Sequence, residues 1–257
     1  MKNKCALIGY TGFIGSNLLD FNKKIIKFNS KNIHKIKNKG FDIVICAGTS
    51  SKIWLSKKKP AEDKRKIKNL IDNLKTIKTN KFVLISTSEV YGKKKSCLET
   101  NLNLQNIDTN YGLNRLMLEN FIEKKFKNNF ILRLPIVYGK NFSKNCIYDL
   151  INKHEIDKLN GSDLIQIYNV ANLKKHIKFV IKNNIKKLNV SSKPIKLSML
   201  AKKFFKIKLN NKKKFRKMDI KSIYGNNNGY FLNNNKTEKD LSIFLKRTKA
   251  WNFVYQT

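Results

Sequence analysis

The chain has 257 residues, of which 55 are Lys or Arg and 17 are Asp or Glu, so its formal net charge is +38. An apolar content of 41% excludes a disordered chain, and only 11 glycines and three prolines exclude a collagen-like or low-complexity one. No apolar run reaches the roughly 18 residues of a transmembrane helix, so we expect no membrane span.

Apolar runs and stripes predict alternating strands and helices in the first half of the chain. A short buried strand at residues 4–9 precedes three glycines and a short helix at 16–21. A helix opens at Pro60, where proline and the acids after it suit a first turn. Further strands are predicted at 24–28, 41–47, 81–86 and 129–134, and a second long helix at 111–126. This alternation predicts an α/β fold with a doubly wound parallel sheet, a Rossmann domain.

Beyond residue 140 the pattern loosens and predicts a small second lobe. It predicts strands near 164–168 and 187–190, and helices near 172–183 and 197–206. The asparagine-rich segments at 226–229 and 233–235 predict loops. We therefore expect a Rossmann domain at 1–140 and a small, partly intertwined second lobe at 141–257.

Three glycines, Gly9, Gly12 and Gly15, come after the first strand in the sequence GYTGFIG. Glycines at this spacing allow a tight turn, close approach of the backbone to a pyrophosphate, and close helix–strand contact. The next helix presents N–H groups to the phosphates. Three glycines also serve a turn alone, but their position after an N-terminal apolar strand favours dinucleotide binding.

Two further motifs carry polar chemistry. STSEVYG, at residues 86–92, lies at the end of a predicted strand, and Tyr111 and Arg115 lie one turn apart at the start of a helix. A cation beside a phenol pulls the phenol pKa toward neutrality, so Tyr111 is predicted to exchange a proton with a sugar hydroxyl or carbonyl. A helical tyrosine is usually a core residue, but the three motifs in this order favour a catalytic site.

Together these motifs resemble those of the extended short-chain dehydrogenases/reductases, in the NAD-dependent epimerase/dehydratase family. GYTGFIG is similar to the family's G-x-x-G-x-x-G fingerprint, STSEVYG to its S-S/T-x-x-V-Y-G segment, and YGLNR to its Y-x-x-x-K. CAG at 46–48 resembles the family's motif after the third strand, and these four motifs are specific as a set. The resemblance continues at 132–140 and, more weakly, at 188–204 and 231–241. The resemblance implies a cytoplasmic NAD(P)-dependent oxidoreductase that acts on a nucleotide-activated sugar by tyrosine-based proton transfer with hydride exchange.

The resemblance also implies roles for individual residues. Tyr111 is the implied acid/base, Thr87 orients the reacting oxygen, and Glu89 is a second acid/base candidate. Arg115 stands where the family's lysine binds the nicotinamide ribose. The implied cofactor-binding residues are Gly9, Thr11, Gly12, Phe13, Ile14, Gly15, Asn29, Ser30, Lys31, Ala47, Gly48, Thr49, Tyr111 and Arg115, and no metal site is implied.

The chain departs from the family pattern at several positions. Arginine replaces lysine at Arg115, and Ile136 replaces an asparagine that often touches the nucleotide sugar. The second strand ends in Asn29, Ser30 and Lys31 without the acid that binds an NAD ribose, which favours NADP over NAD. A 4-keto-sugar reductase and a non-catalytic NAD(P)-binding protein remain alternatives. Family members often pair through the tyrosine-bearing helix and the helix before it, which implies a homodimer.

The positive charge has a compositional explanation. Only five of the basic residues are arginines, and lysine and asparagine, which have A/T-rich codons, are spread over the whole chain. Because nucleic-acid sites favour arginine and cluster their charge, we expect no specific nucleic-acid partner. The densest run, residues 202–217, lies either on an anionic surface or, as we favour, on a solvated helix face and loop. Four widely spaced cysteines without a C-x-x-C pair fit a reducing cytoplasm.

Overall fold

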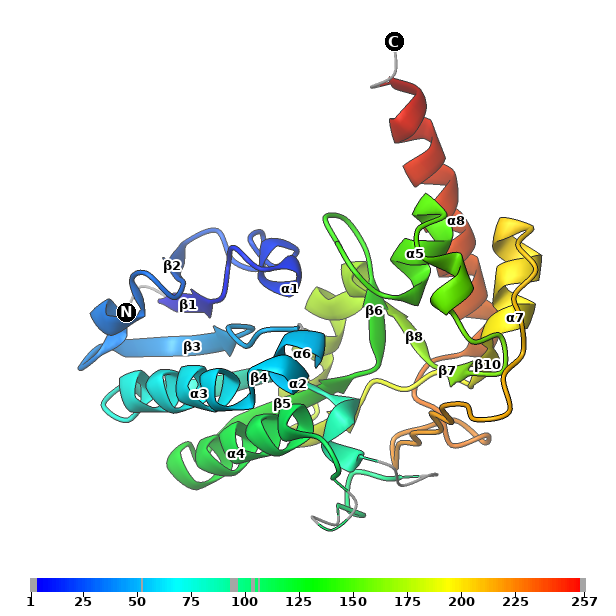
Figure 1. Ribbon diagram of the computed structural model, residues 1–257. Coiled ribbons are helices and arrows are strands. Elements are labelled where there is room, and N and C mark those ends of the chain that lie inside the picture. The colour runs from blue at the N-terminus through cyan, green and yellow to red at the C-terminus, as the bar shows by residue number, and fades with distance from the viewer. Residues whose placement is uncertain (1–3, 52, 93–96, 103–104, 106, 255–257) are drawn as a thin grey trace. The chain divides into compact units, whose positions relative to one another are not determined.

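The computed structural model describes residues 4–51, 53–92, 97–102, 105 and 107–254 (Figure 1). The chain divides into two compact units. Unit 1 comprises Met1–Lys94, Glu99–Leu134 and Asn172–Asn189, and unit 2 comprises Lys95–Leu98, Pro135–Ala171 and Val190–Thr257. The sequence predicts a single boundary at residue 140, and the two units differ from that prediction in two segments. Residues 135–140 belong to unit 2, and residues 172–189 belong to unit 1, where they add a strand to the sheet and a helix that packs on it.

Unit 1 contains a six-stranded, wholly parallel sheet, as the sequence predicts. The strand order is β2-β1-β3-β4-β5-β9, so the chain passes from one side of β1 to the other after β2. This reversal is the topological switch point at which open α/β sheets bind their ligands. The strands are β1 (Cys5–Ile8), β2 (Ile25–Phe28), β3 (Gly40–Cys46), β4 (Lys78–Thr87), β5 (Asn129–Leu134) and β9 (Lys187–Asn189).

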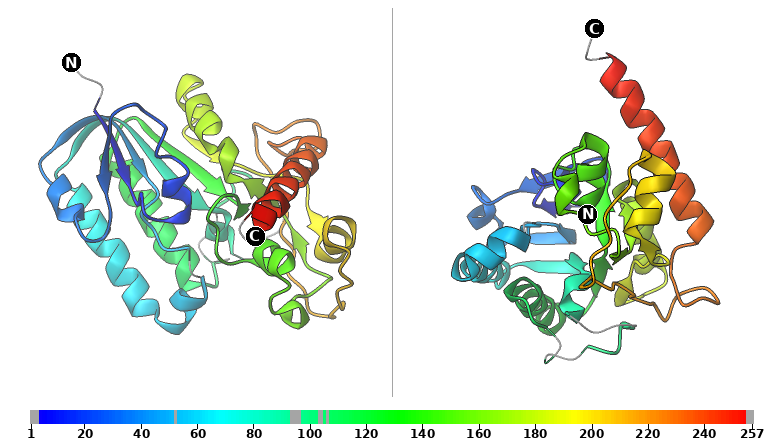
Figure 2. Two further views of the ribbon diagram at one scale, coloured as in Figure 1. Left: turned by 90° about the horizontal axis from the view of Figure 1, so that it is seen from above. Right: turned by 45° about the vertical axis from the view of Figure 1, so that its right-hand side comes forward.

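Helices cover both faces of this sheet (Figure 2). Helices α3 (Pro60–Leu74) and α4 (Asn110–Lys125) pack on one face, where Ile67, Leu74 and Ile122 join the buried strand residues. Helix α6 (Leu173–Lys182) lies on the opposite face. All six residues of β5 are buried, and four of them are apolar. The remaining helical segments of unit 1 are α1 (Phe13–Ser16), α2 (Ile53–Lys58), η1 (Ile33–Ile36) and η2 (Ser88–Tyr91).

The helix expected at residues 16–21 is wrong. Helix α1 is a single turn that ends at Ser16, and turns and bends lead from there to β2. The Ser16 hydroxyl and the Asn17 amide both donate to the Phe13 carbonyl, at 2.9 and 2.8 Å. Such side-chain bonds compete with the helical ladder and favour a turn. The connection between β1 and β2 is therefore short.

Unit 2 is built from two small two-stranded sheets and several helices. Strand β6 (Ile136–Tyr138) pairs in parallel with β8 (Ile167–Asn169), and β7 (Leu164–Ile165) pairs antiparallel with β10 (Ile195–Lys196). The helical segments are α5 (Cys146–Asn152), η4 (Ile156–Lys158), η5 (Val170–Asn172), α7 (Leu197–Leu200), a π-helix η6 (Ala201–Phe205) and α8 (Asn234–Val254). Its core contains residues from sheets and helices alike, among them Tyr138, Ile147, Ile165, Leu200 and Leu241.

The asparagine run at 233–235 begins helix α8 and is not a loop. The Asn233 side-chain oxygen accepts from the Lys236 N–H at 3.3 Å, and the Thr237 hydroxyl donates to the Asn233 carbonyl at 3.0 Å. Asparagine is a strong N-cap because its oxygen satisfies an N–H of the first turn. None of the described helices has the length and apolarity that a bilayer crossing requires.

Candidate active site

The glycine loop after β1 is fixed by close backbone contacts. Gly9 has φ +84°, and a Cβ there would lie 2.4 Å from the Ala47 carbonyl oxygen. A Cβ on Gly15 would lie 2.0 Å from the Gly9 carbonyl oxygen. Both glycines are therefore required by the fold itself, since a side chain at either would collide with backbone.

Gly12 differs from its two neighbours in the motif. Its φ of −80° and ψ of 167° suit any residue, and an added Cβ would meet only the Gly9 carbonyl oxygen, at 3.4 Å. The first helical bond of α1 runs from the Ser16 N–H to the Gly12 carbonyl, at 2.9 Å, so the N–H groups of Ile14 and Gly15 precede the helical ladder. A pyrophosphate fits the space beside Gly12, where it can accept hydrogen bonds from these N–H groups. Because α1 is a single turn, its helix dipole adds little to the attraction.

The end of β2 adjoins the glycine loop. The Gly9 N–H donates to the Phe28 carbonyl at 2.7 Å, and the Asn29 amide donates to the Tyr10 hydroxyl at 3.3 Å. The Asn29 side-chain oxygen accepts from the Lys31 N–H at 2.9 Å, which closes a tight turn. Ser30 and Lys31 are exposed on this turn. A hydroxyl and a cation are therefore available where the adenosine ribose of a dinucleotide lies in such folds.

The segment after β3, Ala47 to Ser50, lies against the same loop. The Ala47 N–H donates to the Ile8 carbonyl at 2.9 Å, at the carboxyl end of β1. A Cβ on Gly48 would lie 2.8 Å from the Ile8 side chain, and Thr49 is half-buried. The predicted cofactor-binding residues after β1, β2 and β3 thus share one edge of the parallel sheet, while Thr11 is exposed on the loop.

The predicted catalytic residues meet where β4 ends and α4 begins. The Thr87 hydroxyl accepts from the Glu89 N–H at 3.2 Å and caps η2. A Cβ on Gly112 would lie 2.5 Å from the Glu89 carbonyl oxygen, so the first turn of α4 touches η2 directly. Tyr111, the residue before Gly112, is therefore beside the Thr87–Glu89 segment, as the motif order predicts.

Arg115 is 2% exposed and lies in a polar cluster that the sequence does not predict. Its Nη1 and Nη2 donate to the two carboxylate oxygens of Asp63 at 3.0 and 3.1 Å, and Nη2 also donates to the Ser50 carbonyl at 2.7 Å. Asp63 also accepts from the Asn114 amide at 2.7 Å and the Ser56 hydroxyl at 3.1 Å. Both terminal nitrogens of Arg115 are thus engaged within the protein, and its buried Nε has no hydrogen-bond partner.

The guanidinium of Arg115 lies over the ring of Tyr111, with Cζ 4.1 Å from the ring centroid. Burial raises the pKa of the Tyr111 phenol, and the opposing effect of Arg115 is not large enough to reverse this, since Glu89 and Asp63 also raise the pKa. The expectation of a phenol tuned toward neutrality is therefore wrong for this structure. Burial and the neighbouring carboxylates thus favour the protonated form of the Tyr111 phenol, which can donate a proton.

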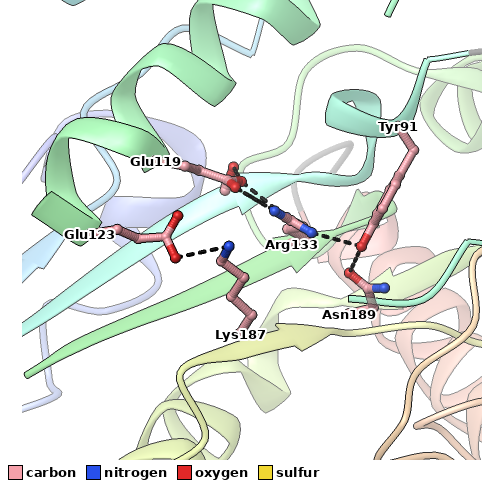
Figure 3. A network of polar contacts seen from close by, with 7 residues as sticks. Tyr91, Glu119, Glu123, Arg133, Lys187 and Asn189 are labelled. Carbon is pink, nitrogen blue, oxygen red and sulfur yellow. Dashed lines mark hydrogen bonds and ion pairs between the residues drawn. The ribbon is translucent and has the colours of Figure 1, made fainter. Parts of the chain in front are cut away.

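A second buried network lies beneath η2 and supports it from the sheet (Figure 3). Arg133 is 1% exposed and pairs with Glu119, its Nη2 donating at 2.6 Å and its Nε contacting both carboxylate oxygens at 3.2 Å. Arg133 Nη1 donates to the Tyr91 hydroxyl at 2.7 Å, and that hydroxyl donates to Asn189 at 2.9 Å. Burial raises the pKa of Tyr91 to about 12. The network joins η2, α4, β5 and β9, so it fixes the strand ends that carry the site.

An open parallel sheet with a glycine loop at its switch point and a tyrosine-bearing helix beside it defines a dinucleotide-binding α/β protein. A family model, the NAD dependent epimerase/dehydratase family, matches residues 26–180. That match covers more than half of the chain, so the protein belongs to this family. A search of curated proteins found no match.

Solved structures of this fold resemble the chain over most of its length. MoeE5, in complex with UDP-glucose and NAD, has a TM-score of 0.72 at 15% identity, covering 99% of this chain and 100% of that one. dTDP-4-dehydrorhamnose reductase from Bacillus anthracis, in complex with NADP, has a TM-score of 0.65 at 20% identity, covering 85% of each chain. UDP-glucuronic acid 4-epimerase from Bacillus cereus has a TM-score of 0.62 at 19% identity, covering 84% and 86%. These likenesses confirm the predicted fold.

Proposed function

We propose that this protein is an NAD(P)-dependent oxidoreductase of the epimerase/dehydratase type that acts on a nucleotide-activated sugar. One observation carries the proposal: the glycine loop and Tyr111 are tied to the same sheet edge. Gly9 contacts Ala47, and Ser50, three residues further on, accepts a hydrogen bond from Arg115 on the helix of Tyr111. Several of the solved structures with this fold contain nucleotide sugars with NAD or are reductases with NADP.

The residues at this edge have distinct roles in such a reaction. When bound, the nicotinamide supplies hydride donor and acceptor chemistry. Tyr111 donates its phenolic proton to the reacting sugar oxygen, or takes one back in the reverse direction. The Thr87 oxygen already accepts from the Glu89 N–H, so its own hydrogen remains to bond the same sugar oxygen. Glu89 is the carboxylate of η2 and would serve as the second acid/base group.

A specific observation favours the second candidate, reduction of a 4-keto sugar. The raised pKa of Tyr111 keeps the phenol protonated at neutral pH, which suits donation to a carbonyl oxygen that receives a hydride. The third candidate, a protein that binds NAD(P) without turnover, is motivated by the departures from the family pattern at Arg115 and Ile136.

NADP is the cofactor we favour. The turn after β2 presents Ser30 and Lys31 to solvent, and residues 29–32 include no carboxylate that would bind a ribose 2′-hydroxyl or repel a 2′-phosphate.

We further propose a cytoplasmic location, which fits the four free cysteines. A homodimer through α3 and α4 would bring the exposed Lys64, Arg65 and Lys68 of both copies together, so we expect pairing to strengthen with salt.

The test is a panel of UDP- and dTDP-sugars and their 4-keto derivatives; the sugars are incubated with NAD+ or NADP+, and the 4-keto derivatives with NADH or NADPH. Cofactor oxidation that requires a 4-keto sugar supports the reductase, and sugar interconversion without net cofactor oxidation supports the epimerase. If no member of the panel reacts although NAD(P) binds tightly, the enzyme proposal fails and the non-catalytic candidate replaces it.

A further inference from the structure

Asp63 is the acceptor around which the buried polar cluster beside Tyr111 is built. It lies in the first turn of α3 and is 8% exposed. Its donors come from Ser56 on α2 and from Asn114 and Arg115 on α4, so one carboxylate joins three helices. Buried charges are stable only when they are paired and hydrogen-bonded, and Asp63 meets this requirement fully.

The pairing geometry determines where the Arg115 cation can be. A bidentate carboxylate fixes the plane of a guanidinium as well as its position. Here that plane is held with Cζ 4.1 Å from the centroid of the Tyr111 ring. The Ser50 carbonyl fixes the same group from the segment after β3. Arg115 therefore has two protein partners and a ring contact before any ligand binds.

We propose that Asp63 is a positioning residue for Tyr111. Its ion pair holds Arg115 over the tyrosine ring, so that the cation orients the phenol and does not serve as the main ribose ligand. The inference deepens the proposed function and rests on it for the role of Tyr111. Asp63 thereby takes part in the reaction, although it lies on a different helix from Arg115 and is 52 positions away from it in the sequence.

The charged groups that face the Tyr111 phenol are Arg115 from α4, Asp63 from α3 and Glu89 from η2. Asp63 and Glu89 raise the phenol pKa, and Arg115 lowers it. If Asp63 holds Arg115 over the ring, Asp63→Asn releases the cation, and the phenol loses the lowering effect of Arg115, which is larger than the raising effect of Asp63. The pKa of Tyr111 should then rise, and the limb of the pH–rate profile that reports Tyr111 should move to higher pH. Removal of the Asp63 charge with Arg115 left in place would move that limb to lower pH.

The experiment compares Asp63→Asn with the parent protein and with a matched control, Glu62→Gln. Glu62 is the preceding residue of α3, and its pair with Lys66 is on the surface. We expect Asp63→Asn to lower kcat by about a hundredfold, the cost of misplacing a catalytic group by an ångström, with little change in the KM of the sugar. The control should match the parent in kcat and pH profile. Circular dichroism melts establish that each variant is folded.

A second readout needs no turnover and separates this inference from the proposed function. The affinity for NADPH is measured by calorimetry for the parent, Asp63→Asn and Arg115→Met, which removes the cation. If Asp63 holds Arg115, both variants should bind NADPH within about threefold of the parent, a difference below 1 kcal/mol. A loss of tenfold or more in folded Arg115→Met, with Asp63→Asn unaffected, would show that Arg115 binds the ribose and would overturn the proposal. A pH profile of an active, folded Asp63→Asn that is unshifted, or shifted to lower pH, would overturn it equally. If the parent protein has no activity, the proposed function fails, and the NADPH affinities of the two variants alone test whether Asp63 holds Arg115.

Discussion

Replacing Gly12 should separate cofactor binding from folding. The backbone of Gly12 is extended, and an added Cβ meets a single atom at an ordinary distance of 3.4 Å. A Gly→Ala change at such a position stabilises a protein by about 0.4–1 kcal/mol, because the unfolded chain loses freedom. Gly12→Ala should therefore melt at the parent's temperature or up to about 3 °C above it.

The same position should control NAD(P) affinity through the larger Gly12→Val. Its side chain fills the space that a pyrophosphate needs beside the loop N–H groups. Losing two charge-assisted hydrogen bonds at about 1.5–3 kcal/mol each removes at least about 3 kcal/mol, or a hundredfold or more in Kd. Isothermal titration with NADPH and NADH measures this loss.

Gly15→Ala is the matched comparison in the same loop. A Cβ there would lie 2.0 Å from the Gly9 carbonyl oxygen, so the backbone must shift. Overpacking of this kind costs about 1–3 kcal/mol or more, and Gly15→Ala should melt well below the parent. Two results would refute the reasoning: parental affinity in Gly12→Val, or a melting temperature of Gly12→Ala as low as that of Gly15→Ala.

Four further outcomes are expected. Tyr111→Phe should lower turnover by about a hundredfold or more and leave NADPH affinity unchanged in calorimetry, since only a proton donor is lost; turnover equal to the parent's would contradict the catalytic assignment. Glu119→Gln leaves Arg133 buried without its countercharge, and urea denaturation should show a loss of about 3–5 kcal/mol, whereas a change under 1 kcal/mol would mean that the pair is not formed. The pKa of Asp63 is below its usual value despite burial, because Arg115 and Asn114 bond the charged form. Its stabilising contribution is therefore present above about pH 4 and lost as the pH falls further, so the denaturation free energy of Asp63→Asn should depend less on pH below 4 than that of the parent. DNA binding, measured by fluorescence anisotropy, should be non-specific and fall by about a thousandfold or more between 50 and 200 mM salt if six or more phosphates are contacted, and sequence preference at the higher salt would contradict the compositional explanation.

The central sheet could be predicted because its signals are local. Strand β5 coincides with the predicted residues 129–134, and α3 starts at the predicted Pro60. The start of helix α8 could not be predicted, because asparagine favours both loops and N-caps, and the residues after it decide between the two. The prediction of a helix after the glycine loop failed for a related reason, since Ser16 and Asn17 bond the backbone instead of continuing the ladder.

The candidate site could be predicted only where its residues lie in contiguous motifs. The glycine loop, Thr87 and Tyr111 belong to such motifs, and their roles stay predictions until they are tested. The environment of Arg115 could not be predicted, because its partner Asp63 is distant in sequence and resembles an acid placed for the helix dipole. The direction of the Tyr111 pKa shift was wrongly predicted for the same reason, since burial and the neighbouring carboxylates are properties of the folded chain.

The place of β9 in the sheet has a consequence for how the protein is made on the ribosome. β5 pairs with β9 from Ile131 to Arg133, but β9 is synthesised only after the whole of Pro135–Ala171, which belongs to unit 2. Until then β5, four of whose six residues are apolar, has an unpaired edge, the feature that invites association with other chains. A nascent or truncated chain that stops near residue 140 should therefore aggregate or bind chaperones, and soluble expression should return once residues 172–189 are included.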